Sequence, residues 1–285
     1  MINKLIDHSP RQWLHFLHKR IFARERLRAF DDDHPCVFVL STGRVGTQTL
    51  AALFKLATNV FAYHEPKPDL YGLSKLSYEY SRHTYAREIL RQAFVIARND
   101  LLNYSQSCAR GYVETSPQAT FLAPVILDAV PNVKFIHLVR DPRDVVRSGM
   151  RRGWYDGHSG DRTRIVPNLE VERRWETWTL FQKNLWLWAE TNGWILDFTS
   201  CMPNRTLMVH SEDVFAADAE ILQRLFDFIN APAPPKYKVS RVLGKKLNAQ
   251  KSGSFPKSLN WNEAMCGELL EICGETAERL GYQFN

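Results

Sequence analysis

Five short apolar runs are spaced along the chain, and segments with the spacing of amphipathic helices lie between them. Continuous apolar runs of this length are typical of strands that are buried on both faces of a parallel sheet. Strands that alternate with helices predict an α/β fold in which helices flank the sheet. We therefore expect one α/β domain with a mainly parallel sheet of four or five strands, at residues 36–41, 59–63, 111–114, 133–139 and 205–210.

The first apolar run, Cys36 to Leu40, ends in a glycine-bearing turn, and a helical pattern begins directly after Gly46. A helix that starts where a parallel strand ends directs unpaired backbone N–H groups and the positive end of its dipole toward the turn. The stretch predicts a site for an anionic group such as phosphate. By itself, the same pattern is equally compatible with a corner that only packs.

The turn differs from the ATP-binding loop, in which a glycine stands five positions before a Gly-Lys-Ser/Thr triplet. Ser41 occupies the position of that glycine, and Gly46 is followed by Thr47 and Gln48. The lysine that reaches the terminal phosphates and the hydroxyl that binds magnesium are therefore missing from their expected places. Arg44 is the cation of this turn.

A second strand-turn-helix pattern spans Val133 to Met150, with Arg140-Asp-Pro-Arg-Asp at the turn and Ser148 on the helix. Together the two stretches resemble the sulfotransferases that use 3′-phosphoadenosine 5′-phosphosulfate (PAPS). In that family the first loop reads approximately Pro-Lys/Arg-Ser-Gly-Thr-Thr and binds the 5′-phosphosulfate. The second reads Arg-Asn/Asp-Pro-x-Asp-x-x-x-Ser and binds the 3′-phosphate, and this chain matches it at every defining position.

The resemblance implies a P-loop type of fold and a specific set of donor-binding residues. It assigns the 3′-phosphate to Arg140 and Ser148. A C-terminal Arg/Lys-Gly segment closes over the nucleotide in the family, and Lys251, Ser252 and Gly253 stand in the corresponding polar loop. It assigns the 5′ end of the donor to Arg44, Val45, Gly46, Thr47, Gln48 and Thr49.

The first loop also departs from the family pattern. Gly43 replaces the proline, Val45 the serine and Gln48 the second threonine. Thr49 stands where cytosolic members often carry a tryptophan that stacks on adenine, so the adenine contact is not assigned. Arginine at position 44 is more similar to the carbohydrate and protein-tyrosine branches than to the cytosolic small-molecule branch.

The family implies transfer of a sulfuryl group from PAPS to a hydroxyl or amine of a small-molecule or saccharide acceptor, giving PAP, and the branch favours a carbohydrate or glycoconjugate. A sulfuryl group carries less charge than a phosphoryl group, so we expect no metal requirement. Two alternatives stay open. A P-loop kinase or nucleotide hydrolase would use magnesium, and a binding protein would hold PAP or another nucleotide without catalysis.

The second apolar run ends in His64-Glu65-Pro66, at the sheet edge where α/β sites collect. Neighbouring strand residues point to opposite faces, so we expect at most one of the pair to face the site. We predict that Glu65 is the base, because Pro66 favours an extended conformation for it and because the arginine-loop branches tend to use glutamate. His64 is the alternative, and Glu114 is next in line.

Composition adds limits to this picture. With 285 residues and 45% hydrophobic residues, the chain can build a large core, which we assign to residues 36–285. Residues 1–35 form a basic extension whose helical pattern at 11–30 fits packing on the domain better than contact with a membrane surface. The net charge of +6 suits an anionic donor, and we expect no nucleic-acid partner.

Three further expectations concern thiols, location and tryptophans. Five scattered cysteines without metal-ligand spacing predict reduced thiols that are mostly buried. The chain has no run of eighteen apolar residues and no apolar core of a signal peptide near its start, which predicts a cytoplasmic protein. Val171, Trp175, Trp178, Leu185 and Trp188 recur at helical spacing, which favours core packing over a sugar-stacking surface.

Overall fold

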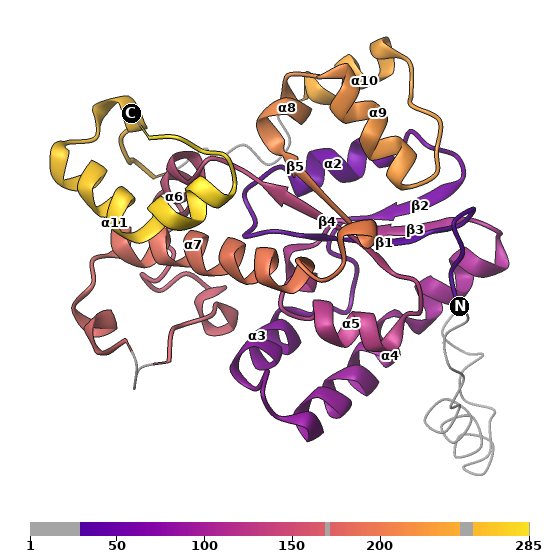
Figure 1. Ribbon diagram of the computed structural model, residues 1–285, viewed down its shortest axis with the longest axis horizontal. Helices are drawn as coiled ribbons and strands as arrows, with labels where there is room; N and C mark the ends of the chain where they lie inside the picture. Colours follow the sequence, from indigo (N-terminus) through magenta and orange to yellow (C-terminus); the bar gives the residue numbers. More distant parts are fainter. Residues whose placement is uncertain (1–28, 169–171, 246–252, 285) are drawn as a thin grey trace, which may run out of the picture.

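In the computed structural model, which describes residues 29–168, 172–245 and 253–284, five parallel strands form one sheet (Figure 1). The predicted fold class is confirmed, and each predicted strand is present to within one residue at either end. The order across the sheet is β2-β3-β1-β4-β5. The strands span Cys36–Leu40 (β1), Val60–Tyr63 (β2), Gly111–Glu114 (β3), Lys134–Val139 (β4) and Thr206–His210 (β5).

Strand β1 lies at the centre of the sheet, paired with β3 on one side and β4 on the other. All five of its side chains are buried, and they alternate between two cores. Val37 and Val39 pack into one core, whereas Cys36, Phe38 and Leu40 pack into the other. This two-sided burial explains why the strand reads as an unbroken apolar run.

The helices cover both faces of the sheet. Figure 1 shows α2, α9 and α10 on one face and α4 and α5 on the other. Helix α7 packs against both α6 and α11. The helices span Thr47–Phe54 (α2), Tyr71–Glu79 (α3), Thr84–Ser107 (α4), Ala123–Ala129 (α5), Pro142–Met150 (α6), Leu180–Thr199 (α7), Ser211–Phe215 (α8), Ala219–Phe228 (α9), Lys236–Leu243 (α10) and Glu263–Arg279 (α11).

The strand order places a topological switch point between β1 and β4. After β1 the chain builds β2 and β3 on one side of it, and then returns to the other side for β4. In open parallel sheets, ligands bind in the crevice outside the carboxyl ends of the strands at such a point. The two sequence motifs follow β1 and β4, so the topology brings them to the same crevice.

A fully buried ion pair joins helix α4 to β3. Arg98 donates from Nε and Nη2 to the Glu114 carboxylate over 2.8 and 3.0 Å, and both side chains are completely buried. The Tyr112 hydroxyl donates to the same carboxylate over 2.6 Å. Arg98 also donates to the carbonyl oxygens of Pro66 and Pro68 over 3.3 and 2.8 Å, so it fixes the loop that follows β2.

The thiol prediction is only partly correct. All five cysteines are free, as expected, but only Cys36 and Cys273 are buried. Cys108, Cys201 and Cys266 are exposed, so the expectation that most thiols are buried is wrong. Cys108 and Cys201 lie at or near the ends of α4 and α7, and Cys266 lies on the outer face of α11. At such positions the helical pattern leaves a small residue in solvent.

The core interpretation of the tryptophans is confirmed for Trp175 and Trp188, which are 6% and 0% exposed. Their helical spacing does not correspond to one continuous helix. Residues 173–177 form a 3-10 turn, and α7 begins only at Leu180. The physical reason is a capping box, in which Thr179 and Gln182 satisfy each other's backbone N–H groups and so fix the start of α7.

Two predictions concern segments outside the described residues. The basic helical pattern at 11–30 falls almost entirely on residues 1–28, and Lys251 and Ser252 fall on residues 246–252. Within the described ranges, no helix is both long enough and apolar enough to cross a membrane.

Buried His137 on β4 predicts a specific pH dependence of stability. Its Nε2 bonds to the Asn192 amide oxygen over 2.9 Å, and burial lowers the pKa of His137 to about 4. Between pH 6.5 and 4 the unfolded chain therefore binds a proton that the folded chain excludes, and stability falls as the pH falls. By pH 4.5 this one residue should account for a loss of about 2–3 kcal/mol in the free energy of unfolding.

The measurement is urea unfolding of the parent and of His137→Gln at pH 7 and pH 4.5. The variant should lose less stability between the two pH values than the parent does. His83→Asn, at an exposed position, is the control and should behave like the parent. Equal pH dependence in all three proteins would show that His137 takes up its proton without unfolding.

Candidate functional site

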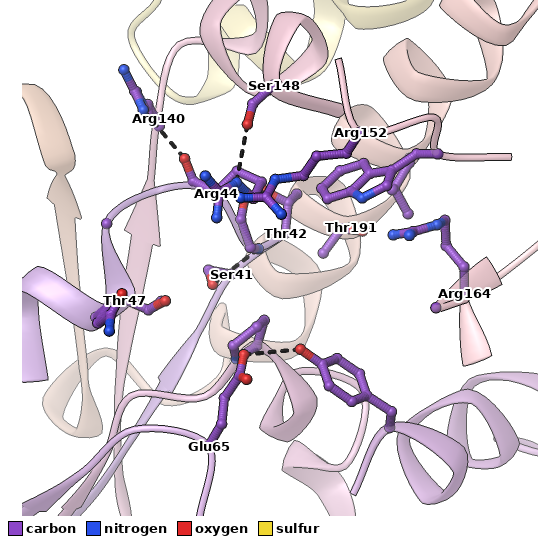
Figure 2. A pocket seen from close by; sticks show the side chains of 18 of the residues that line it. Ser41, Thr42, Arg44, Thr47, Glu65, Arg140, Ser148, Arg152, Arg164 and Thr191 are labelled. Atoms are coloured by element: carbon purple, nitrogen blue, oxygen red, sulfur yellow. Dashed lines mark hydrogen bonds between the residues drawn. The ribbon is translucent and has the colours of Figure 1, made fainter. Parts of the chain in front are cut away.

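A cavity of about 910 Å³ opens where β1, β2 and β4 end (Figure 2). The turn after β1 forms one wall, helix α6 forms another, and the segment from His158 to Ile165 lies opposite. The lining is strongly cationic, which favours anionic ligands. Its acidic residues are Glu65, Asp69 and Asp144, and its cations are Arg44, Lys75, Arg140, Arg147, Arg151, Arg152, Arg164 and Lys245.

The turn after β1 has a backbone that requires glycine. Gly43, Arg44 and Gly46 have φ values of 79°, 62° and 97°. A Cβ atom on Gly46 would lie 2.6 Å from the ring of Phe215. Gly46 is also the N-cap of α2 and has no side chain to cap the helix, so the first N–H groups of α2 are available to an anion.

Arg44 joins the two sequence motifs. Its Nε donates to the Ser148 hydroxyl oxygen over 3.0 Å, and its carbonyl oxygen accepts from Arg140 Nη1 over 3.3 Å. Figure 2 shows these three residues together at one end of the cavity. The turn after β1 and the β4–α6 segment therefore form one site.

The positive charge around Arg44 is concentrated. Burial, followed by the nearby Arg152 and Arg140, lowers the pKa of Arg44 to about 10, whereas the Glu65 carboxylate acts in the opposite direction. Arg44 therefore stays charged at neutral pH. Guanidinium groups held this close repel one another, and a bound anion relieves that repulsion.

Neighbouring elements hold Arg140 in place at the end of β4. Its carbonyl oxygen accepts from the Trp188 indole N–H over 2.9 Å, and its guanidinium donates to Asp144 over 2.7 Å. The following N–H, of Asp141, donates to Glu212 on α8 over 2.8 Å. Arg140 therefore has a fixed backbone and a half-exposed side chain that faces the cavity.

The expectation that only one of His64 and Glu65 faces the site is wrong, because both line the cavity. Strand β2 ends at Tyr63, so the alternation of side chains does not extend to these positions. The extended conformation expected for Glu65 is also wrong, since its φ is 48°. The turn after the strand thus directs both side chains to one side.

Each of the two candidate bases has a defined partner. The Tyr71 hydroxyl donates to Glu65 Oε1 over 2.9 Å (Figure 2), and burial together with that carboxylate raises the pKa of Tyr71, so it remains a donor. His64 Nδ1 lies 2.9 Å from the carbonyl oxygen of Thr115. Because a carbonyl can only accept, the neutral ring carries its proton on Nδ1 and leaves Nε2 as an acceptor.

The reserve base Glu114 is excluded by its surroundings. It is completely buried, its carboxylate is paired with Arg98 and Tyr112, and it does not line the cavity. A carboxylate held in this way serves the fold.

The other donor-binding candidates differ in placement. Thr47, Gln48 and Thr49 line the cavity, whereas the side chain of Val45 is buried in the core and leaves only its backbone for a ligand. Gly253 lies beside helix α6, where its carbonyl oxygen accepts from Arg151 Nε over 3.0 Å. It lines a smaller hollow together with Arg147 and Arg151, both of which also line the main cavity.

Several residues that line the cavity were not predicted from the sequence. Phe215 ends α8, is 42% exposed, and lies against Gly46 with its ring 5.8 Å from the Arg140 guanidinium carbon. Tyr71 and Arg164 belong to neither of the two donor motifs. An aromatic residue left exposed at the end of a helix is a weak signal by itself.

Comparison with known proteins identifies the family of this chain and relates its fold to solved structures. The model of the sulfotransferase family matches residues 35–235. Among solved structures, the sulfotransferase domain from the curacin biosynthetic pathway is 20% identical, with a TM-score of 0.56 over 90% of this chain and 100% of that chain. The sulfotransferase domain from the Synechococcus PCC 7002 olefin synthase is 15% identical, with a TM-score of 0.50 over 91% and 98%. At these identities the structural likeness concerns the fold. Among curated proteins, none matches this chain.

The glycine requirement at position 46 can be tested by stability. Gly46→Ala should lower the free energy of unfolding by about 1–3 kcal/mol, because the position has a left-handed φ and the added methyl group meets Phe215. Gly267→Ala on α11, where the methyl group meets nothing within 4 Å, should not destabilise. The double variant Gly46→Ala/Phe215→Ala should recover only the steric part of the loss.

Urea unfolding of these proteins provides the measurement. If Gly46→Ala is as stable as the parent, the turn after β1 does not have a left-handed φ at Gly46.

Proposed function

Because the chain belongs to the sulfotransferase family, we propose that it transfers a sulfuryl group from PAPS to a hydroxyl or amine acceptor and releases PAP. The observation that carries this proposal is the direct contact of Arg44 with Ser148 and Arg140 in one cationic cavity. A donor with a phosphosulfate at one end and a 3′-phosphate at the other needs both motifs at the same time.

The donor is proposed to lie along the turn after β1 and helix α6. Backbone N–H groups at Gly46 to Gln48 and the Thr47 hydroxyl hold the 5′-phosphate. Arg140 and Ser148 bind the 3′-phosphate, which ADP and ATP lack. Gly253, which lies beside Arg151, is proposed to add a contact near the same phosphate. Lys251 and Ser252 belong to this proposed contact.

Phe215 is proposed as the surface on which adenine packs. Thr49, at the family's tryptophan position, is 7% exposed and too small to stack on a base. The half-exposed ring of Phe215 lies between Gly46 and Arg140. The donor must span the distance between these two residues, because its two ends are proposed to bind near them. Stacking of a base on an aromatic ring contributes on the order of 1–3 kcal/mol.

The reaction is proposed to be an in-line transfer. The acceptor oxygen or nitrogen attacks sulfur and loses its proton to the base, while the bond from sulfur to the bridging oxygen of the 5′-phosphate breaks and its electron pair stays on PAP. Arg44 stabilises the charge that grows on that oxygen. As in phosphoryl transfer, positioning and cations supply most of the catalysis.

Glu65 is proposed as the base, with His64 as the alternative. Tyr71 orients the Glu65 carboxylate, which is close enough to Arg44 to influence its pKa. His64 keeps Nε2 as an acceptor, so its chemistry is also suitable. The two assignments predict different rates of sulfuryl transfer for variants of Glu65 and of His64.

Two competing functions would give different results. A nucleotide kinase or hydrolase would turn over ATP in a magnesium-dependent manner, whereas a binding protein would hold PAP and transfer nothing. Arg140 and Ser148 favour a donor with a 3′-phosphate over ATP. Incubation with sulfur-labelled PAPS and candidate acceptors, saccharides included, tests transfer directly.

Donor selectivity gives the first prediction for this function. PAP should stabilise the protein without magnesium by about 2.7 kcal/mol at a hundred times its dissociation constant, and ADP at the same concentration should stabilise it much less. Thermal unfolding with each ligand measures this difference. Arg140→Ala should lose the preference for PAP, since a charged hydrogen-bonded contact is worth about 1.5–3 kcal/mol.

Arg143→Ala is the matched control, because Arg143 pairs with Asp141 outside the cavity lining. It should keep the preference for PAP. Equal stabilisation by PAP and ADP in the parent would remove Arg140 and Ser148 from the roles given to them.

The base gives the second prediction. Glu65→Gln keeps the shape of the side chain and should lower the rate of sulfuryl transfer by about 10² to 10⁴, with almost unchanged PAP binding. Single-turnover transfer and PAP titration measure the two quantities. Asp69→Asn changes another carboxylate in the lining and should leave the rate near that of the parent.

If His64→Asn is inactive while Glu65→Gln transfers at the parental rate, the assignment is reversed. If both variants are active, the proton leaves by another route and neither residue is the base.

A further inference from the structure

Arg152 and Arg164 line the cavity but belong to neither donor motif. Figure 2 shows Arg152 extending toward Arg44, and Arg164 pointing into the cavity from the opposite wall. The donor, as proposed above, uses Arg44, Arg140 and Ser148. The positive charge of the cavity therefore continues past the reacting group.

Arg164 presents hydrogen-bond donors that the fold does not use. Its guanidinium packs on the ring of Trp154 at 4.2 Å and near the ring of Tyr155 at 5.5 Å. Nε donates to Asp161 over 3.1 Å, which fixes the orientation of the group. Neither terminal nitrogen has a hydrogen-bond partner among the described residues, although the side chain is only 13% exposed. Such a preoriented fork suits a carboxylate or phosphate.

Arg152 connects this fork to the reacting end of the donor. Its side chain extends toward Arg44 (Figure 2), and its charge, like that of Arg140, lowers the pKa of Arg44. Burial lowers the pKa of Arg152 itself. Two cations that lie this close repel each other, so this part of the cavity attracts a second anion next to the donor.

Part of the cavity wall next to Arg164 is apolar. Phe121, Trp154, Ile165 and Leu187 form one cluster of side chains, each less than 8% exposed, and all four line the cavity. A ligand that reaches Arg164 would therefore pack a nonpolar or planar part against this wall.

We propose that Arg152 and Arg164 form an anion subsite for the acceptor, which therefore carries a carboxylate or phosphate group. A nonpolar or ring-shaped segment joins that group to the hydroxyl or amine that receives the sulfuryl group. This inference rests on the proposed function, because it specifies the acceptor of the same site.

The test uses pairs of acceptors that differ in charge. One pair is 3-(4-hydroxyphenyl)propionate and its methyl ester, and the other is glucose 6-phosphate and glucose. Calorimetry measures their binding to the full chain saturated with PAP, and labelled PAPS measures transfer to each of them. We expect the charged member of at least one pair to bind about ten- to a hundredfold more tightly. The pair that responds distinguishes a carboxylate from a phosphate.

Variants locate the subsite. Arg152→Gln removes one of the two charges. Asp161→Asn/Arg164→Gln removes the other without leaving the Asp161 carboxylate unpaired. Each should reduce the preference for the charged member by about tenfold or more. Arg162→Gln, an exposed change on the same segment outside the lining, is the control and should keep it.

The outcomes separate this inference from the proposed function. If PAP does not bind, the proposed function fails first. If PAP binds but the neutral members bind as well as the charged ones, or no probe binds more tightly than about 1 mM, the anion subsite is refuted while PAP recognition stands. If Arg152→Gln weakens PAP and leaves the charge preference intact, Arg152 belongs to the donor and the two-arginine subsite is wrong.

Discussion

The buried ion pair of Arg98 and Glu114 is the constraint on which the geometry of the site depends. It ties helix α4 to β3, and the same guanidinium holds the carbonyl oxygens of Pro66 and Pro68. Those carbonyls belong to the turn that carries His64 and Glu65 to the cavity. Loss of one partner from a buried pair costs on the order of 3–5 kcal/mol, because the other charge stays buried. The position of the candidate bases is therefore coupled to the stability of the sheet.

The switch point of the sheet supplies the other half of the site. Since β1 and β4 are neighbours, the turns that follow them meet. Arg44 of the first motif contacts the second through a hydrogen bond to Ser148 and a carbonyl that accepts from Arg140. One residue thus sets the spacing of the two phosphate-binding segments. Because of these contacts, a change in the turn after β1 would also alter the geometry of the site at the end of β4.

The sequence predicted the strands to within a residue, because a strand buried on both faces leaves an unbroken apolar run. It also singled out Arg44, Arg140 and Ser148, whose motifs are local and which the fold brings together at one cavity. It could not predict the orientation of Glu65, since the alternation of side chains stops where β2 stops and the turn beyond is held by Arg98 from a distant helix. Phe215 and Arg164 were missed for the same reason, because each reaches the cavity only through the packing of segments that are separate in sequence.

The charge of the cavity limits which ligands it can hold together. Two anions in one cavity repel each other, so their simultaneous binding needs more cations than one of them would require. Arg44 and Arg140 face one proposed anion, and Arg152 and Arg164 extend the positive surface toward a second. Asp161 pairs with Arg164 at Nε, which limits repulsion among the cations while the terminal nitrogens stay available to a ligand. The cations in the lining outnumber Glu65, Asp69 and Asp144, and this excess of positive charge supports the proposed transfer between two anionic partners.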